Sequence, residues 1–305
     1  MHVHYFSRAY VDHLTASGAD ERMLNDARRV VTATSDDVTE RLAVMDGSAV
    51  ERQILSMSAA TPYFADRTAA VRGAQFINDE HATLCRNHPE RFAFFAALPM
   101  PHVDAALAEI PRAFDDLHAA GVTFTTSING RPLTDPAFEP VFAELDRRAA
   151  VVFLHPAGFG CEAHLIEDSG LSWPVGAPVE DAICAMQLLQ AEFPRRFPRL
   201  KIIVPHLGGF LPFIRYRLDK ARRMPGGDPA SVQLRKLWYD TANGEPDALA
   251  HAVKVYGADR ILFGSDYPYW TGESYKHAVN YLTLSGLSDA EIAAIQSGNA
   301  RALFS

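Results

Sequence analysis

Two histidines, His2 and His4, stand one residue apart at the start of the chain. In an extended strand alternate side chains share a face, so both imidazoles would point the same way and could bind one metal ion. Histidines near a chain start are also commonly solvated or left from cloning. The pair alone leaves both interpretations open, and the rest of the chain has to decide between them.

Three more side chains that can bind metal or carry protons follow short apolar runs. His155 ends the run VVFLH, His206 follows KIIVP, and Asp266 follows ILFGS. Each alone has a structural explanation, as a hydrogen-bonded core histidine or a helix-capping aspartate. Neutral imidazoles and a carboxylate suit Zn²⁺ and its neighbours, and an open site leaves room for water or a substrate oxygen.

Eight short strand-like runs alternate with longer amphipathic segments along the chain. This pattern predicts an α/β fold, a (β/α)8 TIM barrel, as a single domain over residues 1–305. Barrel enzymes build their sites at the carboxyl ends of the strands, so His2, His4, His155, His206 and Asp266 are expected on one rim. The predicted strands are residues 3–6, 53–58, 92–98, 122–126, 151–155, 201–206, 237–241 and 261–266, and the clearest helices are 66–88, 103–120 and 136–149.

Two segments exceed a minimal barrel and make the predicted barrel a distorted one. Residues 7–39, after the first strand, are long and charged and predict extra helices near the mouth. Residues 158–178, after the fifth strand, are rich in glycine and proline and long enough for a binding loop or lid.

The composition limits the kinds of molecule that this protein is expected to bind. A formal net charge of −8 gives no electrostatic attraction to nucleic acid or an anionic membrane, which favours a small-molecule partner. No stretch is long and apolar enough for a membrane span. The three cysteines, Cys85, Cys161 and Cys184, have no disulfide or zinc-knuckle spacing, which predicts reduced thiols and a cytoplasmic location.

From these residue types and positions we predict that His2, His4, His155 and Asp266 are ligands of one divalent ion, most simply Zn²⁺. A second, bridged ion usually requires a modified lysine or a carboxylate after the fourth strand, and no lysine precedes Lys201. Polar side chains after strands two and four are expected to touch substrate; they are Ser56, Ser58, Thr126 and Asn129.

These motifs, in this order, resemble the metal-dependent amidohydrolase superfamily, and within it the aminocarboxymuconate-semialdehyde decarboxylase-like branch. The motifs are His-x-His, His-Pro, His-x-Gly-Gly and Gly-Ser-Asp-Tyr-Pro. Residues 92–104 and 133–156 look most like the 6-methylsalicylate decarboxylase-type members. The resemblance implies a barrel with Zn²⁺ or Mn²⁺ that removes CO₂ from a small unsaturated or aromatic acid without oxidation.

Roles follow from the resemblance position by position. His2, His4, His155 and Asp266 match the metal ligands, and His206 matches the catalytic acid/base. Trp173 and Tyr269 match aromatic positions that wall the substrate pocket, although a structural role as loop anchors is equally consistent with buried aromatics. Arg217 matches an arginine that reaches into the partner subunit's site, which implies a homodimer.

One position departs from the family pattern. Where the muconate enzymes place a substrate-binding arginine, this chain has Thr32, with Arg28 and Arg29 just upstream. The departure favours an ortho-hydroxybenzoate, whose phenolate and carboxylate oxygens can chelate one ion. The predicted reaction is decarboxylation, with a proton from Asp266 or His206 delivered to the ring carbon that bears the carboxylate.

Two other functions remain open from the sequence. The same ion could activate water to hydrolyse an amide, lactone or carbon–carbon bond, with His206 as base. A non-catalytic metal-binding or assembly role is the third hypothesis, and a full set of ligands with an additional acid/base histidine exceeds what such a role needs.

Overall fold

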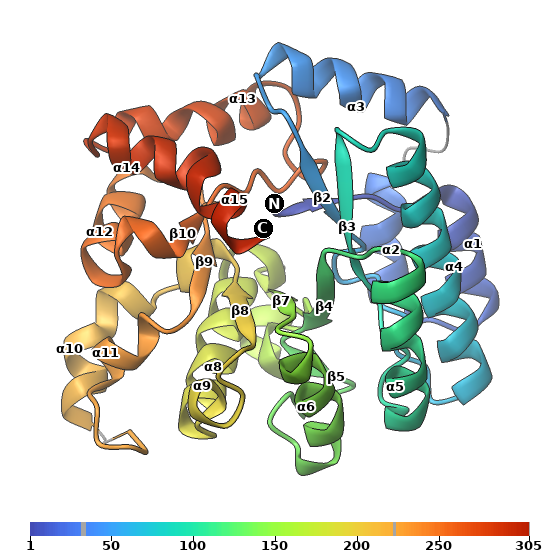
Figure 1. The fold of residues 1–305 in the computed structure, drawn as a ribbon, viewed down its shortest axis with the longest axis horizontal. Coiled ribbons are helices and arrows are strands. Elements are labelled where there is room, and N and C mark those ends of the chain that lie inside the picture. Colours follow the sequence, from blue (N-terminus) through green and yellow to red (C-terminus); the bar gives the residue numbers. More distant parts are fainter. Residues whose placement is uncertain (32–34, 222–223, 305) are drawn as a thin grey trace.

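A parallel sheet of eight strands lies at the centre of the computed structural model, which describes residues 1–31, 35–221 and 224–304 (Figure 1). The strands follow one another in chain order, and each pairs in parallel with the next. An isolated bridge between Val3 and Tyr267 joins the first strand to the segment after the last. The predicted barrel is therefore confirmed. Its strands are β1 (Val3–His4), β2 (Gln53–Ser56), β3 (Phe92–Ala96), β4 (Gly121–Thr125), β7 (Val151–His155), β8 (Lys201–Val204), β9 (Trp238–Asp240) and β10 (Ile261–Leu262).

Helices surround the sheet, and a small antiparallel hairpin of β5 (Ser127–Ile128) and β6 (Arg131–Pro132) follows β4 (Figure 1). None of the helices in the described residues is long and apolar enough to cross a membrane. The helices are α1 (Arg8–Ala16), α2 (Glu21–Val30), α3 (Ser35–Gly47), α4 (Arg67–Asn87), α5 (Val103–Pro111), α6 (Glu139–Arg147), α7 (His164–Glu167), α8 (Ala177–Gln190), α9 (Phe193–Arg196), α10 (Leu211–Ala221), α11 (Ala230–Leu234), α12 (Pro246–Tyr256), α13 (Gly272–Asn280), α14 (Asp289–Ala293) and α15 (Asn299–Leu303).

The two faces of the strands build separate parts of the core, because side chains alternate along a strand. Phe95, Phe153, Ile203 and Leu262 come from four strands and form one buried cluster. The residues that alternate with these along the strands, such as Val152, pack in a larger buried cluster together with side chains from the helices. The imidazole of His2 meets the Phe153 ring edge-on with centroids 5.1 Å apart, so the histidines rest directly on this inner core.

Most strands are shorter than predicted, and three of the predicted strands include a residue whose backbone conformation is not that of a strand. The expected strands 201–206 and 261–266 end at Val204 and Leu262. His206 and Asp266 have φ of +52° and +57°, in the left-handed region that a strand cannot continue through. Ser58, beyond the end of β2, has φ +59° and behaves in the same way.

The predicted helices form with adjusted ends. Asp66 caps α4 by accepting a hydrogen bond from the Ala69 amide, which confirms the expected start. The expected helix 103–120 ends earlier, because α5 passes into a π-helical turn at 112–116. The expected helix 136–149 begins with a 3₁₀ turn and continues as α6.

Both extra segments are present beside the barrel. The first contributes α1 and α2, as predicted. The second, residues 158–178, contains α7 between a 3₁₀ turn at 160–162 and a π-helical turn at 172–176.

Candidate metal centre and active site

His2, directly before β1, and His4 within it lie with their rings 4.9 Å apart, and both residues are fully buried. The Nδ1–H of His2 donates to Asp240 Oδ2 at 2.9 Å. The Nδ1–H of His4 donates to Ser56 Oγ at 2.8 Å, since that hydroxyl in turn donates to the Val3 carbonyl oxygen. These outward bonds fix the tautomers and leave each Nε2 lone pair facing the centre.

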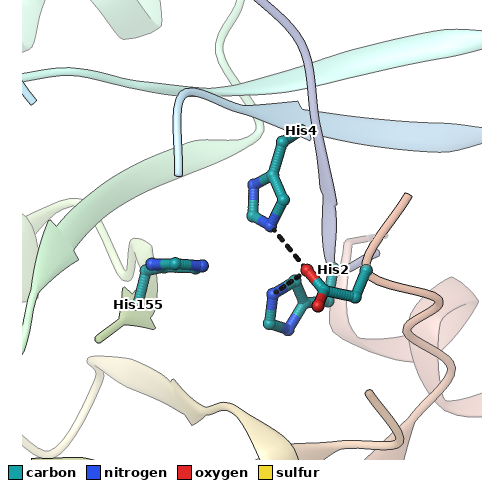
Figure 2. Close-up of side chains that lie close together, drawn as sticks. His2, His4 and His155 are labelled. Carbon is teal, nitrogen blue, oxygen red and sulfur yellow. Dashed lines mark hydrogen bonds and ion pairs between the residues drawn. The ribbon is translucent and has the colours of Figure 1, made fainter. Parts of the chain in front are cut away.

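His155, the last residue of β7, offers the same ring nitrogen. Its Nδ1–H donates to the Pro156 carbonyl oxygen at 2.9 Å. The Ser58 hydroxyl lies 3.4 Å from the His155 Nε2. Three imidazoles from two strands therefore turn Nε2 toward one point, as Figure 2 shows for His2, His4 and His155.

Asp266 completes the group from the turn after β10. Its Oδ1 lies 3.1 Å from His4 Nε2 and 3.4 Å from His2 Nε2. The Asp266 amide donates to the His2 carbonyl oxygen at 2.9 Å, which ties this turn to β1. One donor atom from each of these four residues lies within 4.8 Å of the others.

The protonation states in the pocket match the ligand role of these residues. Burial lowers the pKa of His4 to about 4 and holds the pKa of His155 well below its usual value. Although burial opposes ionisation, the bonds to His2 and His4 keep the pKa of Asp266 well below its usual range. Two imidazoles are thus neutral and the carboxylate is charged, the forms that bind metal.

His2 differs because two carboxylates lie next to it. Burial disfavours its charged form, but Asp240 and Asp266 outweigh burial and raise the pKa of His2 to about 10. Its buried Nε2 has the Asp266 carboxylate 3.4 Å away as an ion-pair partner and forms no closer hydrogen bond. The pocket thus favours positive charge at this nitrogen, which a divalent cation would supply in place of a proton. The three nitrogens and one carboxylate oxygen fit such an ion.

His206 stands beside the cluster, with its ring centroid 5.0 Å from that of His2. Its Nδ1–H donates to Asp181 Oδ2 at 2.8 Å, and its backbone amide donates to Asp240 Oδ1 at 3.0 Å. Burial disfavours the charged ring, but Asp181 outweighs burial and raises the pKa of His206. The Nε2 of this anchored ring is the nitrogen left to exchange a proton.

The second glycine of the motif His-x-Gly-Gly, Gly209, is required for a steric reason. Gly209 has φ +63°, and a Cβ at this position would lie 2.0 Å from the Pro178 carbonyl oxygen. Only glycine lets the turn after β8 pass this close to α8. That contact holds His206 near Asp181, which α8 carries.

An aromatic wall borders the metal centre, formed by Trp173 and Tyr269. Their ring centroids lie 6.2 Å apart. The Trp173 ring is 6.1 Å from His155, and the Tyr269 ring is 5.4 Å from His4. The Tyr269 hydroxyl lies 3.1 Å from Ser58 Oγ, so Ser58 links the wall to His155.

Other residues predicted to touch substrate lie in different environments. Asn129 is exposed at the turn of the β5–β6 hairpin. Arg217 is exposed on α10 and forms no hydrogen bond or ion pair with the site in the part of the chain that the structure describes. The Thr126 hydroxyl donates to Glu180, and that of Ser56 supports His4.

The position of the family's substrate-binding arginine, Thr32, lies outside the described residues. Arg29 on α2 leaves 75% of its side-chain surface exposed and pairs with Asp26 at 3.3 Å.

The sequence analysis did not identify three residues that support the site: Asp181, Asp240 and Asp26. Asp240 gave a signal, because it is the last residue but one of the seventh predicted strand, residues 237–241, much as His155 ends the fifth. Asp181 and Asp26 lie within helices, where a carboxylate is common and its direction cannot be inferred from spacing.

A parallel barrel whose strand ends gather three histidine nitrogens and an aspartate beside a further histidine defines a metal-dependent barrel enzyme. The chain belongs to the amidohydrolase family, whose model matches residues 1–305.

Relatives and solved structures agree with this assignment. Gamma-resorcylate decarboxylase of Rhizobium sp. (strain MTP-10005) is 31% identical over 284 residues, which cover 87% of this chain and 86% of the relative. The 6-methylsalicylic acid decarboxylase of Penicillium expansum is 32% identical over 270 residues, covering 84% and 82%. A dihydroxybenzoic acid decarboxylase from Polaromonas sp. JS666, with bound manganese and the inhibitor 2-nitroresorcinol, superposes with a TM-score of 0.82 at 26% identity, covering 99% and 96%. The resemblance inferred from the motifs is confirmed.

Proposed function

We propose that this chain is a metal-dependent carboxy-lyase that removes CO₂ from a small hydroxylated aromatic acid without oxidation. The observation that carries the proposal is the convergence of His2, His4, His155 and Asp266 beside His206. The relatives named above act on resorcylate and 6-methylsalicylate, which supports an ortho-hydroxybenzoate as the substrate class.

We assign one divalent ion to the four clustered residues. Within the described residues they are the one group of three or more histidine, cysteine or acidic side chains with donor atoms this close. Three nitrogens and one oxygen favour Zn²⁺, with Mn²⁺ as the alternative that the Polaromonas structure supports. When bound, the ion supplies positive charge that orients the acid and stabilises developing negative charge.

The chain's own residues supply the proton and the enclosure. His206, anchored through Nδ1 to Asp181, gives the proton from its other ring nitrogen to the ring carbon bearing the carboxylate. A C–H bond forms there, the bond to the carboxylate carbon breaks, and its electron pair returns to the ring as CO₂ leaves. Asp266 is held toward His2 and His4, so its role here is that of a ligand, with proton transfer left to His206.

The aromatic wall and Ser58 position the acid in this proposal. Trp173 and Tyr269 lie against its ring and exclude water from the reacting carbon. The Ser58 hydroxyl, between His155 and Tyr269, donates to an oxygen of the acid. Asn129, exposed on the hairpin, contributes at most from outside the centre.

We further propose a homodimer and a cytoplasmic location. Phe213 and Tyr216 leave 86% and 72% of their surface exposed on α10, the helix that carries Arg217. Large apolar side chains exposed together favour a protein contact, which would bring Arg217 to a partner's site. The three cysteines form no disulfide, which suits a reducing compartment.

The test combines metal analysis with a substrate screen. Purified protein is expected to hold one equivalent of Zn²⁺ or Mn²⁺ and to release CO₂ from 2,6-dihydroxybenzoate, 6-methylsalicylate or a close analogue. His206→Ala should keep the metal and lose turnover. Incorporation of ¹⁸O from labelled water into product, without CO₂, would replace the proposal with hydrolysis.

A further inference from the structure

The two extra segments beside the barrel are joined through polar contacts. The Trp173 indole Nε1–H donates to Asp26 Oδ2 on α2 at 2.7 Å. The Arg22 guanidinium lies 4.4 Å from the centre of the Phe159 ring, and its Nη1 is 3.5 Å from Glu167 Oε2. Two residues of α2, Arg22 and Asp26, thus contact three residues of the segment 158–178, which lies far from α2 in the sequence.

The bond to Asp26 lies at the centre of this junction. Asp26 keeps 25% of its side-chain surface exposed, whereas Arg22 keeps 60%. Exposed ion pairs contribute little, but a hydrogen bond to a charged acceptor that is mostly shielded is among the stronger ones. The contacts of Arg22 are therefore secondary to the bond between Asp26 and Trp173.

Trp173 has one polar atom with which to fix its ring, and Asp26 uses it. The ring lies directly on the backbone of Gly158, where a Cβ would come within 2.8 Å of the indole. Its other neighbours are His155 and Tyr269. The hydrogen bond to Asp26 therefore sets the position of the wall that faces the metal ligand His155.

The same junction covers one side of the site. His2, His4 and His155 are at most 2% exposed, whereas the side chains of Asp266 and His206 keep 17% and 15% of their surface exposed. Where α2, residues 59–60 and the wall meet, a cavity of about 20 Å³ remains, which holds about one water molecule. The side chains on this side of the site are therefore packed together with little space between them.

We propose that Asp26 is a positioning residue: through the Trp173 indole it joins α2 to residues 158–178, and together they form a cover on this side of the site that holds the aromatic wall in place against the acid. The nature of the acid, though not the existence of the cover, rests on the proposed function. Asp26 itself touches no reacting atom and acts through Trp173.

A double-mutant cycle tests this role. Trp173→Phe keeps an aromatic ring and removes the N–H donor together with the second ring of the indole, and Asp26→Ala removes the acceptor alone. Asp26→Ala is expected to raise KM for the acid roughly tenfold, the loss typical of one hydrogen bond to a charged group, with a smaller change in kcat. Trp173→Phe should raise KM by at least as much, and the double variant should match Trp173→Phe, because the acceptor has no effect once its donor is absent. Asp26→Asn keeps an acceptor oxygen and should restore most of the loss.

The matched control is Glu21→Ala, which removes a carboxylate from the same helix. Glu21 pairs with Arg28 in solvent, away from Trp173, so this variant should keep the wild-type KM. Equal effects of Glu21→Ala and Asp26→Ala, or additive effects in the double variant, would overturn the assignment of Asp26.

Hydrogen–deuterium exchange separates this inference from the proposed reaction. Amides of residues 21–30 and 158–176 should exchange faster in Asp26→Ala and Trp173→Phe than in the wild type and Glu21→Ala. Faster exchange in a protein that decarboxylates no tested acid would support the cover and count against the proposed function. Unchanged exchange and an unchanged KM in variants that still decarboxylate the acid would contradict the cover and leave the proposed function in place.

Discussion

The Nδ1 of His206 lies 2.8 Å from Oδ2 of Asp181, a carboxylate on α8 whose side chain is fully buried. The proposed proton donor, His206, lies in the turn after β8, and its hydrogen-bond partner Asp181 lies on α8. Because the bond occupies Nδ1, it fixes which ring nitrogen faces the pocket. The relationship makes Asp181 a positioning residue for the proposed reaction.

Asp181→Ala should therefore lower kcat by roughly 100-fold, the lower end of what a positioned acid/base contributes. Metal content should stay at the wild-type level, since Asp181 is not among the clustered ligands. Inductively coupled plasma analysis and steady-state kinetics on the same preparation check both statements. Loss of metal together with rate would show instead that Asp181 supports the ligands.

The pH profile should also respond to Asp181. Asp181 raises the pKa of His206 against the opposing effect of burial, so the protonated ring persists to higher pH. A proton donor is active below its pKa, and activity falls as the pH rises through it. In Asp181→Asn the charge is absent, and the alkaline limb of kcat/KM should move to lower pH. If the alkaline limb of kcat/KM stays at the wild-type pH, it reports the pKa of a group other than His206.

Removal of the metal should affect both turnover and stability. Dialysis against a chelator is expected to abolish CO₂ release, and Zn²⁺ or Mn²⁺ should restore it. An ion at 100 times its Kd stabilises the folded state by about 2.7 kcal/mol, so the apo protein should melt at a lower temperature. His155→Ala should reproduce both losses without a chelator. Full turnover of either metal-free protein would contradict the proposed site.

The sequence predicted the barrel and the grouping of His2, His4, His155 and Asp266 because both depend on short-range periodicity. Apolar runs of four to seven residues mark strands, and the polar residue at or just after the end of each run marks the rim. His155 and Asp266 were identified in this way. The pattern could not show that β8 and β10 stop early or that His206 and Asp266 adopt left-handed conformations, because apolar periodicity does not specify the φ of a single polar residue.

The supporting residues were not predictable, for a related reason. Asp181 and Asp26 act across distances set by how helices pack on the barrel, and nothing in their local sequence distinguishes them from solvated carboxylates. Trp173 was expected in a loop or lid, yet its partner on α2 lies 147 residues earlier in the chain. Long-range pairs of this kind become visible only in the folded structure.

Arg41 of α3 should prove important for stability although it lies outside the metal centre. It is 1% exposed, and its Nη2 donates to the His4 carbonyl oxygen at 2.7 Å while its guanidinium lies 4.6 Å from the Tyr267 ring centre. Arg41→Met should lower the free energy of unfolding by roughly 2–4 kcal/mol, because a buried acceptor loses its donor.

Denaturant titration measures that loss, with Arg67→Met as the control. Arg67 pairs with Asp104 in solvent, at side-chain exposures of 56% and 72%, and an exposed pair contributes about 1 kcal/mol or less. Metal affinity should also fall in Arg41→Met, since the strand that carries His4 is less firmly held. Equal losses in the two variants would show that the buried contacts of Arg41 add nothing.

His81 should make the stability of the fold depend on pH between about 4 and 6.5. Burial, aided by Arg41 and opposed by the bond to the Tyr5 carbonyl oxygen, lowers the pKa of His81 to about 4. The unfolded chain takes up this proton near pH 6.5 and the folded chain only near pH 4, so the stabilisation is complete above pH 6.5 and is lost as the pH falls. The loss amounts to about 3 kcal/mol. His81→Gln cannot take up the proton, so its unfolding free energy should fall less over this range by that amount, and parallel curves for the two proteins would exclude His81 as the source.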